Sequence, residues 1–342
     1  MQRSMGSQHR RFTLVLVSGL LLLLGLMLLA TSIGETPINL SRAFDSSLVQ
    51  NPDRVMLFSV RLPRVVMGAL CGIALGVVGA SLQALLKNPL ADPYVLGTSG
   101  GAALGGTLVL VMGASVNRAL FLPMGAFVGA LAATAFVYFI ATKSDSLSVT
   151  GVLLAGIVVN AFASAAITFI KLLVSATQAH ELLFWLVGAI GYEPWSILGV
   201  VSIYVFVGST IMVMLSGRMN LMSLGDSAAN HLGVELKRIK SILFIATALV
   251  VGGVVSFCGM IGFVGLVVPH GVRLVLGPDH RWVVPVSAFA GGAFLVLADL
   301  GARMLFHWLG SEAPVGAVTA MIGCPLFLWL LSRGNLQERL PL

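Results

Sequence analysis

The chain has 342 residues, of which 58% are hydrophobic and only 10% are charged, and its mean hydropathy is +1.00. Soluble domains carry about 25% charged residues, so this composition excludes a soluble enzyme or a nucleic-acid-binding domain. It indicates an all-α polytopic membrane protein, with one transmembrane domain covering residues 1–342. Lys and Arg in cytoplasmic loops explain the net charge of +7.

Cysteine and histidine do not point to a metal site. Cys71, Cys258 and Cys324 all lie in apolar runs, their number is odd, and none belongs to a CxxC pair. Neither a disulfide framework nor a zinc site is therefore expected, and small residues packed between helices are the better interpretation. A metal held by His270 and His280 is an alternative, but their separation matches no common ligand spacing. We predict no cofactor.

Apolar runs predict about ten transmembrane helices. The first run, 12–32, is long enough to cross roughly 30 Å of hydrocarbon. A signal peptide is the alternative for this run, but residues 31–35 form a poor cleavage site. More Lys and Arg fall on the side that holds both ends of the chain, so both termini are predicted to be cytoplasmic. The spans are 12–32, 64–86, 96–113, 119–141, 149–174, 194–215, 240–258, 261–276, 283–306 and 314–332.

The second span carries small residues at a spacing close to four. Gly68, Gly72, Gly76 and Gly79 then share one face of the helix. A groove of small residues allows another helix to approach closely. The pattern predicts tight helix packing and says nothing by itself about what the protein carries.

The sequence predicts a structure for two of the connections between spans. Residues 86–97 contain the turn dipeptides Asn88-Pro89 and Asp92-Pro93, which interrupt a helix. The glycines that follow could cradle an anion, although a tight re-entry turn is the simpler interpretation, and the chain has no Walker-type GxxxxGK[ST] sequence for ATP. Residues 178–191 are too short to cross and too apolar for a free loop, so we expect a helix at the outer surface.

Residues 216–240 form the longest polar interruption of the chain. They predict two short helical pieces hinged at Gly225, the second with Asp226 as N-cap and Gly233 just after its end. Ala228, Ala229 and Leu232 would share one side of that piece. A helix this short needs a surface to lie on, either lipid headgroups or a soluble partner.

Charged residues also stand near the outer ends of spans. Asp299 and Arg303 lie four apart on one helix face and can pair. A charge inside a span is a hint of function, and a structural ion pair explains it equally well.

Several segments of the chain occur together in an order that is highly specific. They read RLPRVVMGALCGIALGVVGASLQALLKNPLADPYVLGTSGGA, SLGDSAANHLGV, GFVGLVVPHGVRLVLGPDHR, ADLGAR and APVGAVTAMIGCPLFLWLL. This combination resembles the FecCD/BtuC-like family, the membrane permease subunits of ABC importers for iron chelates, haem and vitamin B12. The resemblance implies the type II ABC importer permease fold, a homodimer in the bacterial inner membrane, two cytosolic ATPase subunits and a periplasmic binding protein.

The resemblance also assigns roles to residues. It implies that the apolar side of the short helix faces an ATPase subunit instead of lipid, and that arginines on the outer rim dock the binding protein. The rim positions are Arg61, Arg64 and Arg303. The ATPase-coupling residues are Leu224, Gly225, Asp226, Ala228, Ala229, Leu232, Gly233 and Val234.

The chain is then a permease that makes and breaks no bonds, with ATP hydrolysed by a separate subunit. Its cargo is an iron–siderophore, haem or cobalamin, moved by alternating access, and Asn160, Ser164 and Thr168 are candidates for the pathway wall. The alternative is an ion-coupled secondary transporter, which also has glycine-rich and interrupted helices. Such a carrier needs titratable groups at mid-membrane, and the predicted spans have almost none there.

Overall fold

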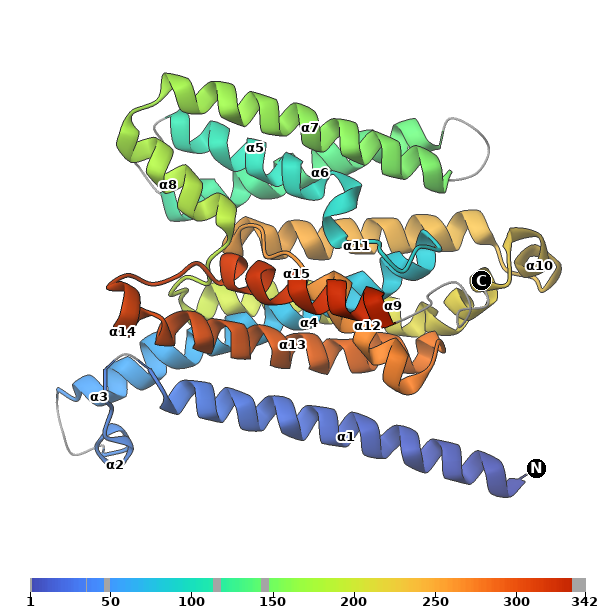
Figure 1. The fold of residues 1–342 in the computed structure, drawn as a ribbon, viewed down its shortest axis with the longest axis horizontal. Coiled ribbons are helices and arrows are strands. Elements are labelled where there is room, and N and C mark those ends of the chain that lie inside the picture. Colours follow the sequence, from blue (N-terminus) through green and yellow to red (C-terminus); the bar gives the residue numbers. More distant parts are fainter. Residues whose placement is uncertain (1, 35, 46–49, 113–117, 143–147, 334–342) are drawn as a thin grey trace.

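A computed structural model describes residues 2–34, 36–45, 50–112, 118–142 and 148–333, and every regular element within these ranges is helical (Figure 1). Seven of the described helical segments are long and apolar enough to cross a membrane, and three shorter apolar helices complete the predicted spans. The membrane helices are α1 Gln2–Ser32, α4 Leu62–Leu85, α5 Thr98–Val111, α6 Arg118–Ala141, α7 Val149–Leu173, α9 Trp195–Ser223, α11 Leu236–Cys258, α12 Val264–Leu276, α13 His280–Met304 and α15 Val315–Arg333.

Short helices lie at the two ends of the bundle. In Figure 1 the beginning of α1 and the end of α15 lie at the same end as α10, whereas α2, α3, α8 and α14 lie towards the other end. The short elements are α2 Leu40–Ala43, α3 Pro52–Val55, the π-helix η1 Met56–Arg61, the 3-10 helix η2 Pro93–Leu96, α8 Ala176–Val187, α10 Asp226–His231 and α14 Phe306–Leu309.

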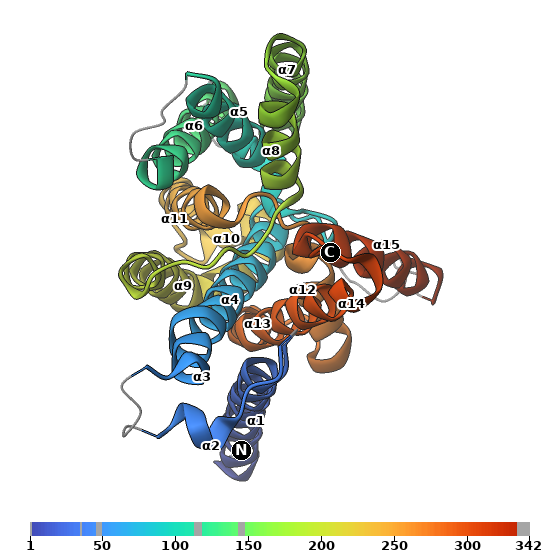
Figure 2. The same cartoon turned by 90° about the vertical axis from the view of Figure 1, so that its left-hand side faces the viewer.

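Helix α4 is the centre of the bundle. The segment Pro52–Leu85, which ends with α4, is long enough to cross a membrane, and 83% of its most apolar stretch of 18 residues is buried. The helix packs against α13, α9, α12 and α11, which surround it in the end-on view (Figure 2). A helix that is apolar on every side has to be covered on every side, and α4 reads as such a helix.

Glycines on α4 allow its neighbours to approach to backbone contact. A Cβ atom would lie 2.2 Å from the Gly291 carbonyl oxygen at Gly72, and 2.1 Å from that of Ser287 at Gly76. At Gly79 it would lie 1.9 Å from the carbonyl oxygen of Gly265 on α12. The face predicted to be a packing groove therefore lies against α13 and α12. A Cβ atom at Gly68, nearer the other end, would meet only side-chain atoms, of Ile190 at 3.3 Å and of Val296 at 4.0 Å.

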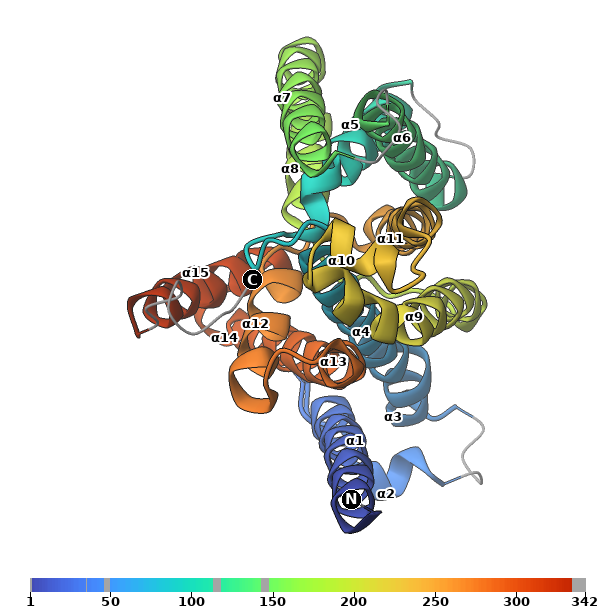
Figure 3. The same ribbon diagram turned by 90° about the vertical axis from the view of Figure 1, so that its right-hand side faces the viewer.

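Helices α5, α6, α7 and α8 form a group on one side of α4, and α1 lies on the opposite side (Figures 1 and 3). The pair α5 and α6 repeats the glycine contact. A Cβ atom at Gly101 would lie 2.3 Å from the Gly129 carbonyl oxygen, and one at Gly105 would lie 2.2 Å from that of Gly125. Helix α1 packs mainly on α13 and leaves most of its apolar surface exposed, as a helix in contact with lipid does.

Two helices have different ends from those predicted. The surface helix expected over 178–191 is α8, which begins earlier because Ser175 and Gln178 form a capping box, and ends at Val187 because Gly188 has a φ of +85°. Helix α9 has 29 residues and continues to Ser223. The first of the two short pieces predicted within 216–240 is therefore wrong as a separate helix. It is the end of α9, which is longer than the hydrocarbon core requires.

Candidate functional site

The polar segment 216–240 contains a sharp hinge followed by one short helix. Gly225 has a φ of +104°, which favours glycine, and it is the N-cap of α10. The prediction that Asp226 is the N-cap is therefore wrong, because Asp226 is already the first helical residue. Its carboxylate accepts hydrogen bonds from two lysines instead of a backbone N–H of the helix.

The end of α10 follows the predicted signal. Gly233 has a φ of +80°, its N–H donates to the Asn230 carbonyl oxygen at 3.0 Å, and the Val234 N–H donates to that of Ala229 at 3.0 Å. This pair of bonds is a Schellman motif, which satisfies carbonyl groups at a helix end. The helix is thus closed at both ends by glycines with positive φ, which fixes where its side chains point.

The coupling residues divide into exposed and buried sets. Leu224 and Leu232 are 62% and 59% exposed, and Ala228 is exposed beside them. Ala229 and Val234 are buried against the rest of the chain. The prediction that Ala229 faces outward with Ala228 and Leu232 is therefore wrong, because adjacent residues on a helix point about 100° apart.

Asp226 joins α10 to two other parts of the chain. Its Oδ1 atom lies 2.7 Å from Nζ of Lys87, and its Oδ2 atom lies 2.8 Å from Nζ of Lys240. Partial burial acts to raise the pKa of Asp226, but the hydrogen bonds and charges of the two lysines outweigh it and lower that pKa. Asp226, Lys87 and Lys240 are called the Asp226 ion-pair cluster below.

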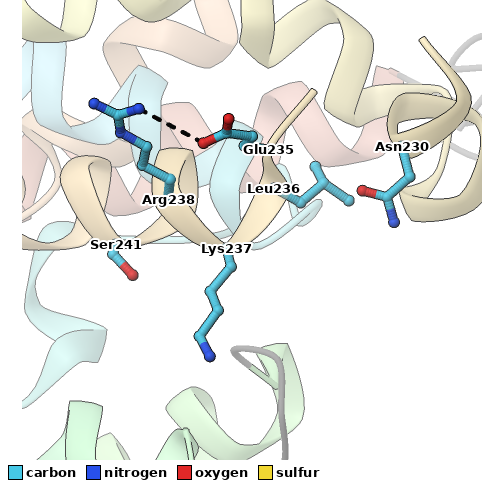
Figure 4. Close-up of a pocket in the computed structure, with 6 residues that line it drawn as sticks. All are labelled: Asn230, Glu235, Leu236, Lys237, Arg238 and Ser241. Atoms are coloured by element: carbon cyan, nitrogen blue, oxygen red, sulfur yellow. Dashed lines mark ion pairs between the residues drawn. The ribbon is translucent and has the colours of Figure 1, made fainter. Parts of the chain in front are cut away.

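An open pocket of about 520 Å³ lies beside α10, where α11 begins (Figure 4). Lys237 points away from the pair that Arg238 makes with Glu235, whose nitrogen and oxygen lie 3.6 Å apart. Arg218, Lys237 and Arg238 are exposed, whereas Lys240 is buried. This end of the bundle therefore presents basic side chains and two exposed leucines together. The lining residues are Asn230, Glu235, Leu236, Lys237, Arg238 and Ser241.

A second pocket, of about 370 Å³, lies between α5 and α7 and contains all the predicted pathway residues. Asn160, Ser164 and Thr168 follow one face of α7, and Lys171 continues that face. Hydroxyl, amide and ammonium groups thus line one wall, and no acidic residue joins them. The other lining residues are Ser99, Gly100, Ala103, Ile167, Leu186 and Met260.

Asn160 has a structural bond on each side of its amide. Its Nδ2 atom donates to the Tyr94 carbonyl oxygen at 3.0 Å, and its Oδ1 atom accepts from the Gly100 N–H at 3.0 Å. Asn160 therefore ties α7 to η2 and to the first turn of α5. Of the predicted pathway residues, Asn160 is therefore a positioning residue, while Ser164 and Thr168 line the pocket together with Lys171, for which no role was predicted.

Arg64 is buried in an ion-pair cluster at the other end of the bundle. Its Nη2 atom lies 3.0 Å from Oδ1 of Asp299, and its Nη1 atom lies 2.8 Å from Oε2 of Glu312. Oδ2 of Asp299 lies 3.1 Å from Nε of Arg303, which confirms the pair predicted from their spacing. Tyr192 donates to Glu312 and accepts from Arg64. These residues link α4, α13 and the loops before α9 and α15.

Arg61 and Arg303 cap the end of α1. Arg303 donates to the carbonyl oxygens of Ala30 and Ile33, and Arg61 donates to those of Ser32 and Thr36. The last carbonyl groups of a helix lack partners within it and carry partial negative charge, so two guanidinium groups are well matched to them. The two arginines therefore attach α1 to η1 and α13.

The predicted docking arginines are thus not free rim charges. Arg61, Arg64 and Arg303 are 5%, 4% and 5% exposed. Each meets carboxylates or carbonyl groups of its own chain. The expectation that these three arginines lie on an open rim is corrected: their side chains are buried, and buried guanidinium groups need partners within the protein. Contact with a docking protein stays a prediction.

Sequence reasoning missed the partners of these residues. The sequence predicts no role for Lys87, Glu312 or Tyr192. The sequence signal for such a partner is Lys87, a lone lysine directly before the turn dipeptide Asn88-Pro89. His280 pairs with Asn220 at 2.9 Å through Nδ1, and within the described residues no group of three His, Cys, Asp or Glu gathers as a metal site would need.

These features define a class of membrane protein. The chain is a multi-pass helical membrane protein with a polar pocket between its helices and a separate, rigidly capped short helix at one end. The FecCD transport family model matches residues 21–333, and the chain belongs to that family.

Named relatives and a solved structure agree with this assignment. The cobalamin import system permease protein BtuC of Halobacterium salinarum is 41% identical over 278 residues, covering 81% of this chain and 73% of that protein. The hemin transport system permease protein HmuU of Yersinia pestis is 38% identical over 283 residues, covering 82% and 84%. A structure described as a metal-chelate type ABC transporter in an inward-facing conformation superposes with a TM-score of 0.84 at 27% identity, covering 94% of this chain and 99% of that one.

Proposed function

We propose that the chain is the membrane permease subunit of an ABC importer that carries a metal chelate, such as an iron–siderophore, haem or cobalamin, across the bacterial inner membrane. The relatives supply the class of cargo, since they are permeases for cobalamin and hemin import. ATP is bound and hydrolysed by a separate subunit, and the permease supplies the pathway.

The observation that carries this proposal is the short helix α10. Leu224, the C-cap of α9, and Leu232, the C-cap of α10, flank this helix and are more than half exposed, and glycines with positive φ close it at both ends. Exposed leucines on a rigid, partly charged surface suit a protein partner, because docking removes their apolar area from water. We assign this surface to an ATPase subunit, with the exposed Arg218, Lys237 and Arg238 around it.

The assembly follows from the same assignment. We propose two copies of this chain with two ATPase subunits at the α10 end and a binding protein at the opposite end. The α10 end is then cytoplasmic, and both termini are cytoplasmic too, since α1 begins and α15 ends there (Figure 1). Asp299, Arg61, Arg64 and Arg303 are buried beneath the face that would contact the binding protein, and their contacts hold the helices that form it.

The pathway is proposed to run past the pocket between α5 and α7. Ser164 and Thr168 line it, and Lys171 is its charged group. A pathway wall with few charged groups lets a large cargo pass without strong binding, because a transported molecule must be bound weakly enough to leave each site. ATP-driven alternating access would open this wall first to one side and then to the other.

The test is Leu232→Glu in the permease. A carboxylate on this surface would have to be desolvated in the contact with the ATPase, which is costly. We expect the variant to fold but to lose co-purification with the ATPase and stimulation of ATP turnover. Leu40→Glu, at an exposed leucine in α2 at the other end, is the matched control. Normal assembly and ATP-dependent uptake with Leu232→Glu would refute the docking assignment.

A further inference from the structure

Lys87 has a backbone conformation that lysine rarely adopts. It follows the C-cap of α4 with a φ of +47°. Its N–H donates to the Ala84 carbonyl oxygen, and the Asn88 N–H donates to that of Gln83, so α4 ends in a Schellman motif with Lys87 at the position usually taken by glycine. A side chain in the left-handed region costs conformational energy. Residues other than glycine that are held in this region occur most often at functional sites.

The ammonium group of Lys87 reaches a defined target. It lies 2.7 Å from Oδ1 of Asp226, on the first turn of α10. The other oxygen of that carboxylate bonds Lys240, whose side chain is 4% exposed on α11. Lys240 therefore anchors α10 to its own neighbour in sequence, whereas Lys87 joins α10 to a segment more than a hundred residues earlier.

The segment that begins at Lys87 leads to the pathway wall through short contacts. Asn88 and Asp92 each accept a backbone N–H two residues on, at 2.9 Å, which stiffens the turn. Then η2 follows, and its Tyr94 carbonyl oxygen accepts from Asn160 on α7. A Cβ atom at Gly156 of α7 would lie 1.8 Å from the Val95 carbonyl oxygen, so α7 and η2 touch through their backbones.

We propose that Lys87 is the positioning residue that passes a displacement of α10 to the α7 wall of the pathway, through the segment 86–97 and Asn160. The inference rests on the proposed function, since it needs an ATPase that moves α10. The segment is attached to α7 by backbone contact and by Asn160, to α4 by the Schellman motif, and to α10 by the ion pair of Lys87 with Asp226. A displacement of α10 therefore reaches the segment through that ion pair. Removing the ion pair uncouples it from α10 and leaves the α7 contacts intact.

Lys87→Gly is the variant that separates this role from a merely structural one. Glycine adopts the observed φ without strain, so the end of α4 should be at least as stable as before. The ammonium group is lost, however. Lys87→Arg keeps a cation with the same strain. Arg42→Met removes a cation from an exposed pair with Asp53 at the opposite end of the bundle and is the charge control.

The measurement is hydrogen–deuterium exchange of the permease assembled with its ATPase, without nucleotide and trapped with ATP and vanadate. In the parent, we expect trapping to change exchange in both 226–231 and 86–97. In Lys87→Gly the change in 86–97 should disappear while that in 226–231 persists. Transport per ATP, measured with hemin, cobalamin and ferric citrate in turn, should fall roughly fivefold, as for residues that couple two sites without touching a ligand. Lys87→Arg and Arg42→Met should behave like the parent.

The outcomes distinguish this inference from the function on which it rests. An equal response of 86–97 in the parent and in Lys87→Gly, with unchanged transport per ATP, overturns the role of Lys87 and leaves the permease assignment standing. If adding the ATPase protects no part of 226–231 even in the parent, the docking assignment fails, and the inference fails with it. Loss of the response in Lys87→Gly at full thermal stability supports it.

Discussion

Gly76→Ala tests whether backbone contact between α4 and α13 carries stability. The added methyl carbon would lie 2.1 Å from the Ser287 carbonyl oxygen, an atom that cannot rotate away. Non-bonded atoms of this kind prefer about 3.5 Å, so the helices would have to separate locally by roughly 1 Å.

The expected cost follows from two opposing terms. Overpacking a well-packed interior costs about 1–3 kcal/mol. Alanine gains about 1 kcal/mol over glycine within a helix. Because the clash is with a backbone atom, the upper part of the overpacking range applies, about 2–3 kcal/mol, and the net effect should be a loss of about 1–2 kcal/mol. A Cβ atom added at Gly199 on α9 would meet no atom within 4 Å, so Gly199→Ala should show only the gain.

The assay is thermal unfolding of both variants in the same detergent, followed by tryptophan fluorescence. We expect Gly76→Ala to unfold below the parent and Gly199→Ala to unfold at or above it. Their difference measures the steric term, since the change in helix propensity is the same in both. Equal unfolding temperatures for the two variants would show that α4 does not lie in backbone contact with α13.

Three other changes probe polar groups that have partners within the chain. Asp299→Ala leaves Arg64 and Arg303 without their shared carboxylate and should cost about 3–5 kcal/mol of stability, measured by the same unfolding assay; parent-like stability would contradict the ion-pair cluster. Burial raises the pKa of Asp92 from 3.8 to about 6, so stability is lost as pH rises through that range, and Asp92→Asn should stabilise at about pH 8 but not near pH 4. A stabilisation that does not change with pH would argue against this. Asn160→Ala should weaken the attachment of α7 to η2 and speed amide exchange at Gly100, and unchanged exchange would exclude that contact.

Features set by neighbours along the chain could be predicted from the sequence. The apolar runs predicted the membrane helices, because a span needs enough consecutive apolar residues to cross the hydrocarbon. The end of α10 at Gly233 was also predictable, since it depends on which residue tolerates positive φ. The start of α10 was not, because Asp226 had a choice between capping its own helix and pairing with two lysines.

The polar segment 216–240 shows the same difference between what the sequence predicts and what only the structure shows. Its polarity and short length, read from the sequence, indicated a helix lying on a surface. Only the structure shows that Leu224 and Leu232 are exposed while Ala229 is buried, since this depends on how α10 is oriented on its neighbours. Burial of an alanine is a weak signal in any pattern, because alanine is common on both faces of a helix.

The sequence by itself determined that this protein is a bundle of membrane helices with close glycine contacts, and its motifs determined the family. The spacing of Asp299 and Arg303 predicted their pair, but tertiary structure alone decided which charged groups distant in the sequence are partners. Arg64 meets a carboxylate 235 residues away, and Lys87 meets one 139 residues away. Hydrophobicity and helix propensity are summed over neighbouring residues, so a sequence displays them. An ion pair between residues distant in the sequence forms only where folding places two particular atoms within about 3 Å, and no local pattern records that distance.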